Sequence, residues 1–154
     1  MVFAFHGYGD TGSGLRSYLG VEEVLGGKAL FVYPDGQAQF ETGGNSGWNR
    51  EVGGEDVAFF DAMRERLAED SCLDTDRVFS VGHSRGGRMV ETLSCARQAV
   101  HRGFMQIAAE YKPASLGDAL HGGSLRPTKS KSIFGHWGKQ IGRASCRERV
   151  CYAV

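Results

Sequence analysis

Short apolar runs alternate with segments of helical spacing along most of the chain. The runs that predict buried strands, because they are short and rich in β-branched or aromatic residues, are residues 2–5, 29–33, 78–81 and 103–108. The segments with helical spacing of apolar positions are residues 15–25, residues 55–67 and a stretch from about residue 86 to residue 99. This alternation predicts an α/β fold, a mostly parallel sheet covered by helices on both faces.

One predicted strand-to-helix junction carries a chemical motif. The strand at residues 78–81 leads into Gly-His-Ser-Arg-Gly at residues 82–86, and Gly-x-Ser-x-Gly between a strand and a helix is typical of a nucleophile elbow. The two glycines leave room for the strand and the helix to cross. The motif predicts Ser84 as a nucleophile and the backbone N–H of Arg85 as an oxyanion donor. A glycine-rich turn with an incidental serine is the alternative.

A glycine-rich loop follows the first predicted strand. Residues 6–14, HGYGDTGSG, contain the His-Gly-x-Gly pattern that commonly supplies the second oxyanion donor after an early strand. The backbone N–H of Tyr8 is the expected donor, since glycines let the backbone approach a substrate. An ordinary strand-to-helix turn is the alternative. We expect His6, at the end of a core strand, to be a buried structural histidine.

A second loop, from residue 37 to residue 54, is long and rich in glycine. Loops at the carboxyl end of a strand often form the wall of a binding site. This one contains Trp48 and Asn49, which together with Tyr8 would suit an aromatic or sugar-linked acyl ester. His83, beside the predicted nucleophile, is expected to shape the same pocket.

Five segments together resemble the extracellular esterases related to polyhydroxybutyrate depolymerases and feruloyl esterases, a branch of the α/β-hydrolases. They are VFAFHGYGDTGSG (residues 2–14), VYPDG (32–36), GWN (47–49), EDVAFFDAM (55–63) and CLDTDRVFSVGHSRGGRM (72–89). They occur in the order of that family and cover roughly residues 2 to 110. The resemblance implies an α/β-hydrolase fold and a secreted, monomeric serine esterase without a cofactor. It also implies an ester substrate of the polyester, feruloyl or acetyl-xylan type.

A serine hydrolase needs a histidine base and an acid that orients it. In the family these follow the nucleophile, first the Asp and then the His. The residues of these types after Ser84 are His101, Asp118, His121 and His136. None of them fits the triad positions that the resemblance implies. We therefore expect this chain to lack the base and the acid, and to show only residual hydrolysis although its parent protein is an esterase.

Both ends of the chain depart from the family. The resemblance implies further β-structure before Met1, which we interpret as a start inside a gene fragment. Residues 141–150, IGRASCRERV, resemble translated sequencing-adapter read-through and not a protein motif. We predict a partial α/β-hydrolase catalytic domain at residues 1–140, truncated at both ends, and a non-native tail at residues 141–154.

Composition narrows the class of protein further. With 41% hydrophobic residues and a net charge of zero over 154 residues, the chain lacks the basic field that attracts nucleic acid. Its apolar runs are too short to span a membrane, and no His, Cys or Asp spacing suggests a metal site. The resemblance implies a disulfide between Cys72 and Cys95, with two buried free thiols as the alternative.

Two interpretations from other classes remain open at this point. One is a different serine hydrolase, such as a peptidase on the same fold, because fold alone does not specify a reaction. The other is an inactive fragment or a non-catalytic binding module.

Overall fold

The computed structural model describes residues 1–38, 44–70, 73–109, 132–137 and 140–145. In this part of the chain a six-stranded sheet has the strand order β2-β1-β3-β4-β5-β6. The strands are β1 Val2–Phe5, β2 Phe31–Val32, β3 Val78–His83, β4 His101–Ile107, β5 Ser132–Trp137 and β6 Gln140–Ser145. All neighbouring strands are parallel except β5 and β6, which are antiparallel.

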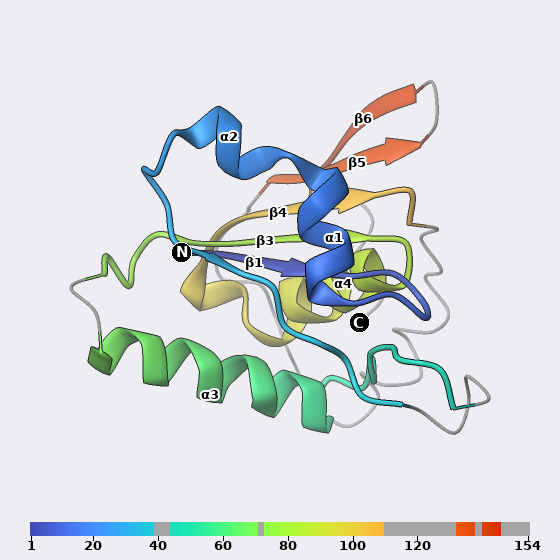
Figure 1. The fold of residues 1–154 in the computed structure, drawn as a ribbon, viewed down its shortest axis with the longest axis horizontal. Coiled ribbons are helices and arrows are strands. Elements are labelled where there is room, and N and C mark those ends of the chain that lie inside the picture. The colour runs from blue at the N-terminus through green and yellow to red at the C-terminus, as the bar shows by residue number, and fades with distance from the viewer. Residues whose placement is uncertain (39–43, 71–72, 110–131, 138–139, 146–154) are drawn as a thin grey trace.

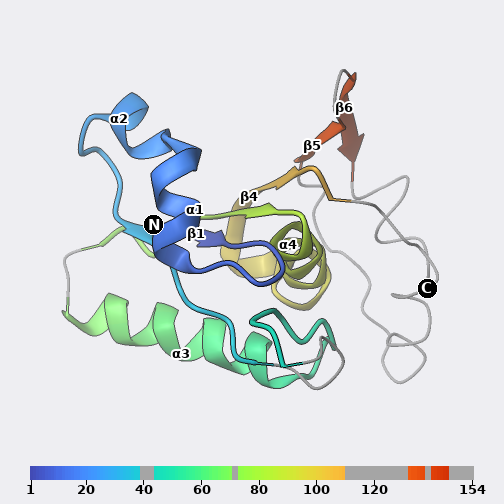
Figure 2. The same ribbon diagram turned by 45° about the vertical axis from the view of Figure 1, so that its right-hand side comes forward.

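Helices cover both faces of this sheet (Figure 1, Figure 2). The helices are α1 Gly12–Leu19, α2 Val21–Leu25, α3 Glu55–Asp70 and α4 Arg85–Ala96, followed by a 3₁₀ turn at Gln98–Val100. The α1 helix packs on one face, and α3 and α4 pack on the other. The predicted architecture, a mostly parallel sheet with helices on both faces, is confirmed. None of the described helices combines the length and the apolar character that a membrane span requires.

Strand β1 shows why the sheet has two buried faces. Phe3 and Phe5 are fully buried in the core on the α3 and α4 side, where the Phe3 ring meets Phe60 edge-on with ring centroids 4.9 Å apart. Ala4, between them, belongs to the core on the other side together with Leu15 of α1. Because successive strand residues point to opposite faces, four residues contribute to both cores.

Some elements are shorter than their sequence pattern predicted. The segment expected as one helix over residues 15–25 is divided at Gly20, which has a φ of 63° in the left-handed region and caps α1. Glycine adopts this conformation without strain, so a single residue accounts for the division. The α4 helix ends at Ala96, a few residues early. The strand expected over residues 29–33 is regular only at Phe31–Val32.

The α4 helix is anchored near both of its ends. At the N-terminal end, the side chain of Gln106 in β4 donates a hydrogen bond to the carbonyl of Gly87 at 2.8 Å. At the other end, the Arg97 guanidinium donates to both carboxylate oxygens of Asp61 in α3, at 2.8 and 2.6 Å. A two-point contact of this kind fixes orientation as well as distance. The helix that follows Ser84 is therefore held against both the sheet and α3.

Part of the predicted non-native tail forms a strand. Residues 140–145 make up β6, which pairs antiparallel with β5. Residues 146–154 lie outside the described residues. The predicted domain boundary near residue 140 therefore stays a prediction.

Candidate active site

Ser84 lies between β3 and α4 in a backbone conformation that is rare for a residue with a side chain. Its φ is 52° and its ψ is −115°. Among the described residues, only Ser84 and Ala108 have a positive φ without being glycine. Such a conformation costs of order 1–3 kcal/mol and persists only where the surrounding structure enforces it. The Ser84 N–H donates to the carbonyl of Ile107 at 2.9 Å, which ties this strained residue to β4.

Two glycines allow the backbones to cross at this turn. A Cβ atom on Gly86 would lie 2.0 Å from the carbonyl oxygen of Phe5 in β1. A Cβ atom on Gly82 would lie 2.2 Å from the carbonyl oxygen of Gly86. Backbone atoms occupy the space that a side chain would need, so the crossing requires glycine at both positions, as the motif predicted.

Ser84 lines an open depression of about 340 Å³. The residues that line it are Tyr8, Ser84, Arg85, Arg88 and Ala108. Tyr8 comes from the loop after β1, Arg85 and Arg88 from the first turn of α4, and Ala108 from the end of β4. The depression thus lies at the carboxyl ends of three neighbouring parallel strands, the usual position of a ligand site in such a sheet. The structure brings Tyr8, Ser84 and Arg85 together, and their catalytic roles stay predictions.

Trp48 lies in the core and not on a substrate wall. Its side chain is 0% exposed, its indole N–H donates to the carbonyl of His6 at 2.9 Å, and its ring meets Phe5 edge-on. The expectation that Trp48 contacts substrate is therefore wrong, because the side chain has no accessible surface. Burial of a large aromatic ring with its N–H satisfied outweighs the surface preference of the glycine-rich loop around it.

Asn49 is half-buried in the turn that leads into α3. Its N–H donates to the carboxylate of Asp56, and its Oδ1 accepts a hydrogen bond from the N–H of Glu51 at 3.0 Å. Asn49 does not line the depression at Ser84. A contact between Asn49 and substrate stays a prediction, whereas its contacts with α3 give it a structural role.

A chain of hydrogen bonds leads from the loop after β1 to the residue before Ser84. The Tyr18 hydroxyl donates to Asp10 Oδ2 at 3.1 Å and lies 3.0 Å from His83 Nδ1. Burial, and secondarily the hydrogen bond to Asp10, raises the pKa of Tyr18 to about 12, so the hydroxyl keeps its proton. Because that single proton goes to Asp10, the Nδ1–H of His83 donates to the Tyr18 oxygen. This network fixes the ring of His83, and the role of His83 in shaping the pocket stays a prediction.

His6 is a structural histidine, as expected. It is fully buried at the end of β1. Its Nε2 accepts the N–H of Gly36 at 2.8 Å, so its Nδ1 carries the proton and donates to the carbonyl of Gly7 at 2.7 Å. Both ring nitrogens are therefore engaged, which leaves neither to act as a base.

Of the histidines that follow Ser84, His101 is the one whose side chain the structure describes, and both of its ring nitrogens are engaged. His101 is fully buried, with Nε2 2.8 Å from the Ser80 hydroxyl and Nδ1 2.9 Å from the carbonyl of Arg97. Of His136 the structure gives only its position in β5, opposite Ile107 of β4. Asp118 and His121 lie outside the described residues.

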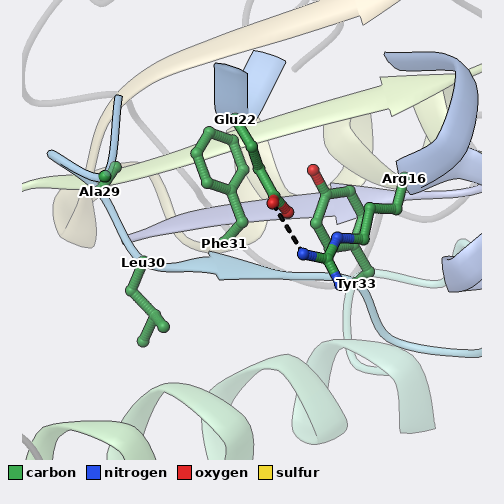
Figure 3. Close-up of a pocket in the computed structure, with 7 residues that line it drawn as sticks. Arg16, Glu22, Ala29, Leu30, Phe31 and Tyr33 are labelled. Carbon is green, nitrogen blue, oxygen red and sulfur yellow. Dashed lines mark hydrogen bonds and ion pairs between the residues drawn. The ribbon is translucent and has the colours of Figure 1, made fainter. Parts of the chain in front are cut away.

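A second depression, of about 370 Å³, lies beside β2 (Figure 3). Arg16 and Glu22 face each other there and form an ion pair of 2.9 Å. The remaining lining residues are Gly27, Ala29, Leu30, Phe31 and Tyr33. Among its described lining residues there is no serine, cysteine or histidine, so the depression at Ser84 is the better candidate for an active site.

Cys95 is half-buried in α4, and Cys72 lies outside the described residues, so the predicted disulfide stays a prediction. No group of three or more His, Cys, Asp or Glu side chains within the described ranges could hold a metal ion.

Glu91 is a buried acid in the middle of α4. Its side chain is 4% exposed, and its Oε1 has no hydrogen-bond partner among the described residues. Burial raises the pKa of Glu91 to about 7, although the charges of Arg88 and Arg50 oppose the shift. The carboxyl is therefore more readily protonated in the folded chain than in the unfolded one.

Replacing Glu91 with glutamine is expected to remove a pH dependence of folding stability. The folded chain holds the Glu91 proton with a pKa of about 7, against the ordinary 4.5 of the unfolded chain. This difference stabilises the fold fully below pH 4.5, and the stabilisation is lost as the pH rises through 7. The shift corresponds to about 3 kcal/mol at most. Urea unfolding measures the free energy of unfolding at pH 5 and at pH 8. Its decrease between these two pH values should be larger in the wild type than in Glu91→Gln. The control Glu23→Gln, at an exposed position, should behave as the wild type does. Equal losses in all three proteins would show that burial of Glu91 has no such effect.

The comparisons with known sequences point to one class of enzyme. The chain is 36% identical over 108 residues to feruloyl esterase C of Emericella nidulans. This alignment covers 66% of this chain and 37% of that protein. It is 39% identical over 85 residues to feruloyl esterase D of Neurospora crassa, an alignment that covers 54% of this chain and 27% of that protein. These relatives confirm the resemblance to feruloyl esterases. The chain spans little more than a third of the length of the first of them, and no family model matches it.

The comparison with solved structures addresses the fold. An acetyl xylan esterase from Aspergillus awamori matches with a TM-score of 0.57 and 19% sequence identity, covering 68% of this chain and 39% of that one. The match confirms the α/β-hydrolase fold that the sequence motifs predicted.

Proposed function

We propose that this chain, which has the α/β-hydrolase fold and is related to feruloyl esterases, is the nucleophile-bearing part of a serine esterase. The observation that supports this most strongly is Ser84 itself. It combines a positive φ at the start of α4 with a place in the depression at the carboxyl ends of the central strands. A strained, half-buried serine at such a turn, beside an open depression, supports the assignment of this turn as a nucleophile elbow.

In the proposed reaction the Ser84 oxygen attacks the acyl carbon of an ester while a base takes the hydroxyl proton. The carbonyl oxygen becomes an oxyanion, which the N–H groups of Tyr8 and Arg85 stabilise. Cleavage of the acyl–oxygen bond releases the alcohol, which receives the proton from the base. Water then attacks the acyl-enzyme by the same route and releases the carboxylic acid. We place the base and its orienting acid outside the described residues. Both nitrogens of His6 and of His101 are engaged in structural contacts, Nδ1 of His83 is bound to Tyr18, and His136 does not fit the triad position that the sequence resemblance implies.

We propose a feruloyl or acetyl-xylan ester of the plant cell wall as the substrate, and an extracellular location that follows from it. Support for the substrate comes from the relatives, which are named as feruloyl esterases, and from the structural neighbour, which is named as an acetyl xylan esterase. Polyesters, which the sequence resemblance also implied, form the third class to assay.

Hydrolysis assays on the full-length enzyme, with its base and acid, test this function. Methyl ferulate, acetylated xylan, polyhydroxybutyrate and a peptide nitroanilide would be compared. We expect turnover of methyl ferulate or acetylated xylan and its loss after treatment with a fluorophosphonate. Turnover of the peptide alone would favour a peptidase, and turnover of none of the four would contradict the proposal.

The Tyr8→Phe variant separates the backbone of Tyr8 from its hydroxyl. The variant keeps the N–H and loses the hydrogen bond that the hydroxyl accepts from Asn45 Nδ2 at 2.8 Å. We expect kcat/KM for 4-nitrophenyl acetate to change by less than about tenfold, whereas loss of an oxyanion donor costs about 10²–10³-fold. A thousandfold loss in steady-state kinetics would mean that the hydroxyl takes part in catalysis.

A further inference from the structure

The two proposed oxyanion donors come from separate segments of the chain. The N–H of Tyr8 lies in the loop after β1, and that of Arg85 lies at the start of α4. Both have to lie about 2.7–3.1 Å from one oxygen atom in the transition state. The segments pack closely at Gly7, where a Cβ atom would lie 3.3 Å from His83 Nδ1 and 3.5 Å from Ser84 Cβ. A small shift between the two segments would therefore separate the donors.

The hydroxyl of Tyr18 in α1 bonds both segments. It donates to Asp10 Oδ2 at 3.1 Å, and Asp10 follows Tyr8 by two residues in the loop. It accepts the Nδ1–H of His83 at 3.0 Å, and His83 directly precedes Ser84. The rings of Tyr18 and His83 also meet edge-on, with centroids 5.5 Å apart. One side chain thus joins the loop that carries one donor to the turn that carries the other.

The Asp10 end of this link is fixed to the backbone of the loop. Asp10 Oδ1 accepts the N–H of Thr11 at 2.8 Å, and the Asp10 carbonyl accepts the hydroxyl of Ser46 at 2.7 Å. The carbonyl of Ser46 in turn accepts the N–H of Gly9 at 2.9 Å. Because Asp10 is held at both its side chain and its backbone, the contact with Tyr18 constrains the loop itself.

Neither core packing nor a place in the depression accounts for Tyr18. Its side chain is 54% exposed, and it belongs to neither core cluster, whereas Leu15 of the same helix does. It is not among the described residues that line the depression at Ser84. The feature that distinguishes Tyr18 is therefore the pair of hydroxyl contacts with Asp10 and His83.

We propose that Tyr18 is a positioning residue, whose hydroxyl holds the loop of Tyr8 in register with the turn of Ser84 so that both oxyanion donors reach the same oxygen. This inference rests on the proposed esterase function and adds a residue to its machinery. Tyr18 acts through Asp10 and His83, without a contact to the substrate. A displacement of about 1 Å can cost about 10²-fold in rate, so the loss of one such link has a measurable effect.

Replacing Tyr18 with phenylalanine in the full-length enzyme removes the hydroxyl and keeps the ring. We expect kcat/KM for 4-nitrophenyl acetate to fall about tenfold to hundredfold. Acylation and deacylation both pass through an oxyanion, so kcat should carry the loss while KM stays within about threefold. Active sites are counted from the end point of fluorophosphonate labelling, so unfolded molecules do not lower the measured rate.

The matched control is Tyr33→Phe. Burial raises the pKa of both Tyr18 and Tyr33 to about 12, and each substitution removes one hydroxyl. Tyr33 lines the depression beside β2 (Figure 3), so its substitution should leave kcat/KM within about twofold.

A double variant tests whether the link acts as a unit. In His83→Ala the link is cut at the turn, so adding Tyr18→Phe should lower kcat/KM by less than about twofold more. If the losses of the two single variants multiply, Tyr18 and His83 have independent roles and the proposal is overturned.

Nitrogen-15 spectra of the full-length enzyme, labelled at histidine, observe the link without turnover. The Nδ1 resonance of His83, assigned by its loss in His83→Ala, should shift in Tyr18→Phe and stay in place in Tyr33→Phe. An unmoved resonance in Tyr18→Phe, activity of that variant within twofold of the wild type, or a loss confined to KM would overturn the positioning role while the esterase function stands. If the wild type hydrolyses no ester, the function fails and the positioning role fails with it.

Discussion

Replacing Ser84 with alanine is expected to lower kcat/KM of the full-length enzyme for 4-nitrophenyl acetate by about 10⁴–10⁶-fold. The substitution removes the oxygen that attacks the acyl carbon, so no acyl-enzyme can form. The N–H groups of Tyr8 and Arg85 remain, and an oxyanion hole with its binding site retains about 10³–10⁴-fold acceleration over water. Steady-state kinetics on purified wild type and Ser84→Ala measure the difference.

The matched control for this result is Ser17→Ala. Ser17 is exposed on α1, and its hydroxyl donates to the carbonyl of Gly14 at 2.7 Å, so its loss should leave kcat/KM within about twofold. Thermal unfolding of both variants excludes loss of the fold as the cause. If Ser84→Ala keeps more than about a tenth of the wild-type activity, Ser84 is not the nucleophile.

Replacing Gly86 with alanine is expected to destabilise the fold by about 3 kcal/mol or more. In an ordinary helix position the same change stabilises by up to about 1 kcal/mol. Here the new Cβ would lie 2.0 Å from the carbonyl oxygen of Phe5 and 2.5 Å from that of His6. Both are backbone atoms of the central strand β1 and the residue after it, which cannot yield as a flexible side chain would. Overpacking of this kind typically costs about 1–3 kcal/mol, and a backbone contact takes the upper end of that range.

Urea unfolding compares this variant with Gly53→Ala. A Cβ atom on Gly53 meets nothing within 4 Å, so that change should alter the free energy of unfolding by less than about 0.5 kcal/mol. Similar values for the two variants would mean that α4 crosses β1 with more room than the structure shows.

The parts of the fold that depend on neighbours in sequence could be predicted. In β1, the alternation of Phe3 and Phe5 with Ala4 assigns each side chain to one face, because the period of a strand is two residues. The position of Ser84 between a strand and a helix follows from local spacing alone. Arg88, which also lines the depression, was not among the predicted site residues, although it lies one helical turn after Arg85 and its place on that face could be predicted from the spacing.

The parts that depend on distant contacts could not be predicted. Trp48 sits in a glycine-rich segment that favours the surface, and its burial depends on a carbonyl 42 residues away, that of His6. The hydroxyl of Tyr18 reaches His83 across 65 residues. No periodicity or motif encodes such pairs, because they arise only when the layers of the fold pack together. The division of the first helix is different, since the left-handed Gly20 could have been suspected from its type.

The most direct test of the central claim, that Ser84 is the nucleophile of an esterase, is to map the fluorophosphonate adduct on the full-length enzyme. Trypsin cleaves after Arg77 and Arg85, so the expected peptide is VFSVGHSR, which contains both Ser80 and Ser84. Fragmentation of the peptide distinguishes the two serines. We predict a single adduct on Ser84 that grows in proportion to the loss of ester hydrolysis. An adduct on another serine that tracks the loss of activity, or full inhibition with Ser84 unmodified, would contradict the claim.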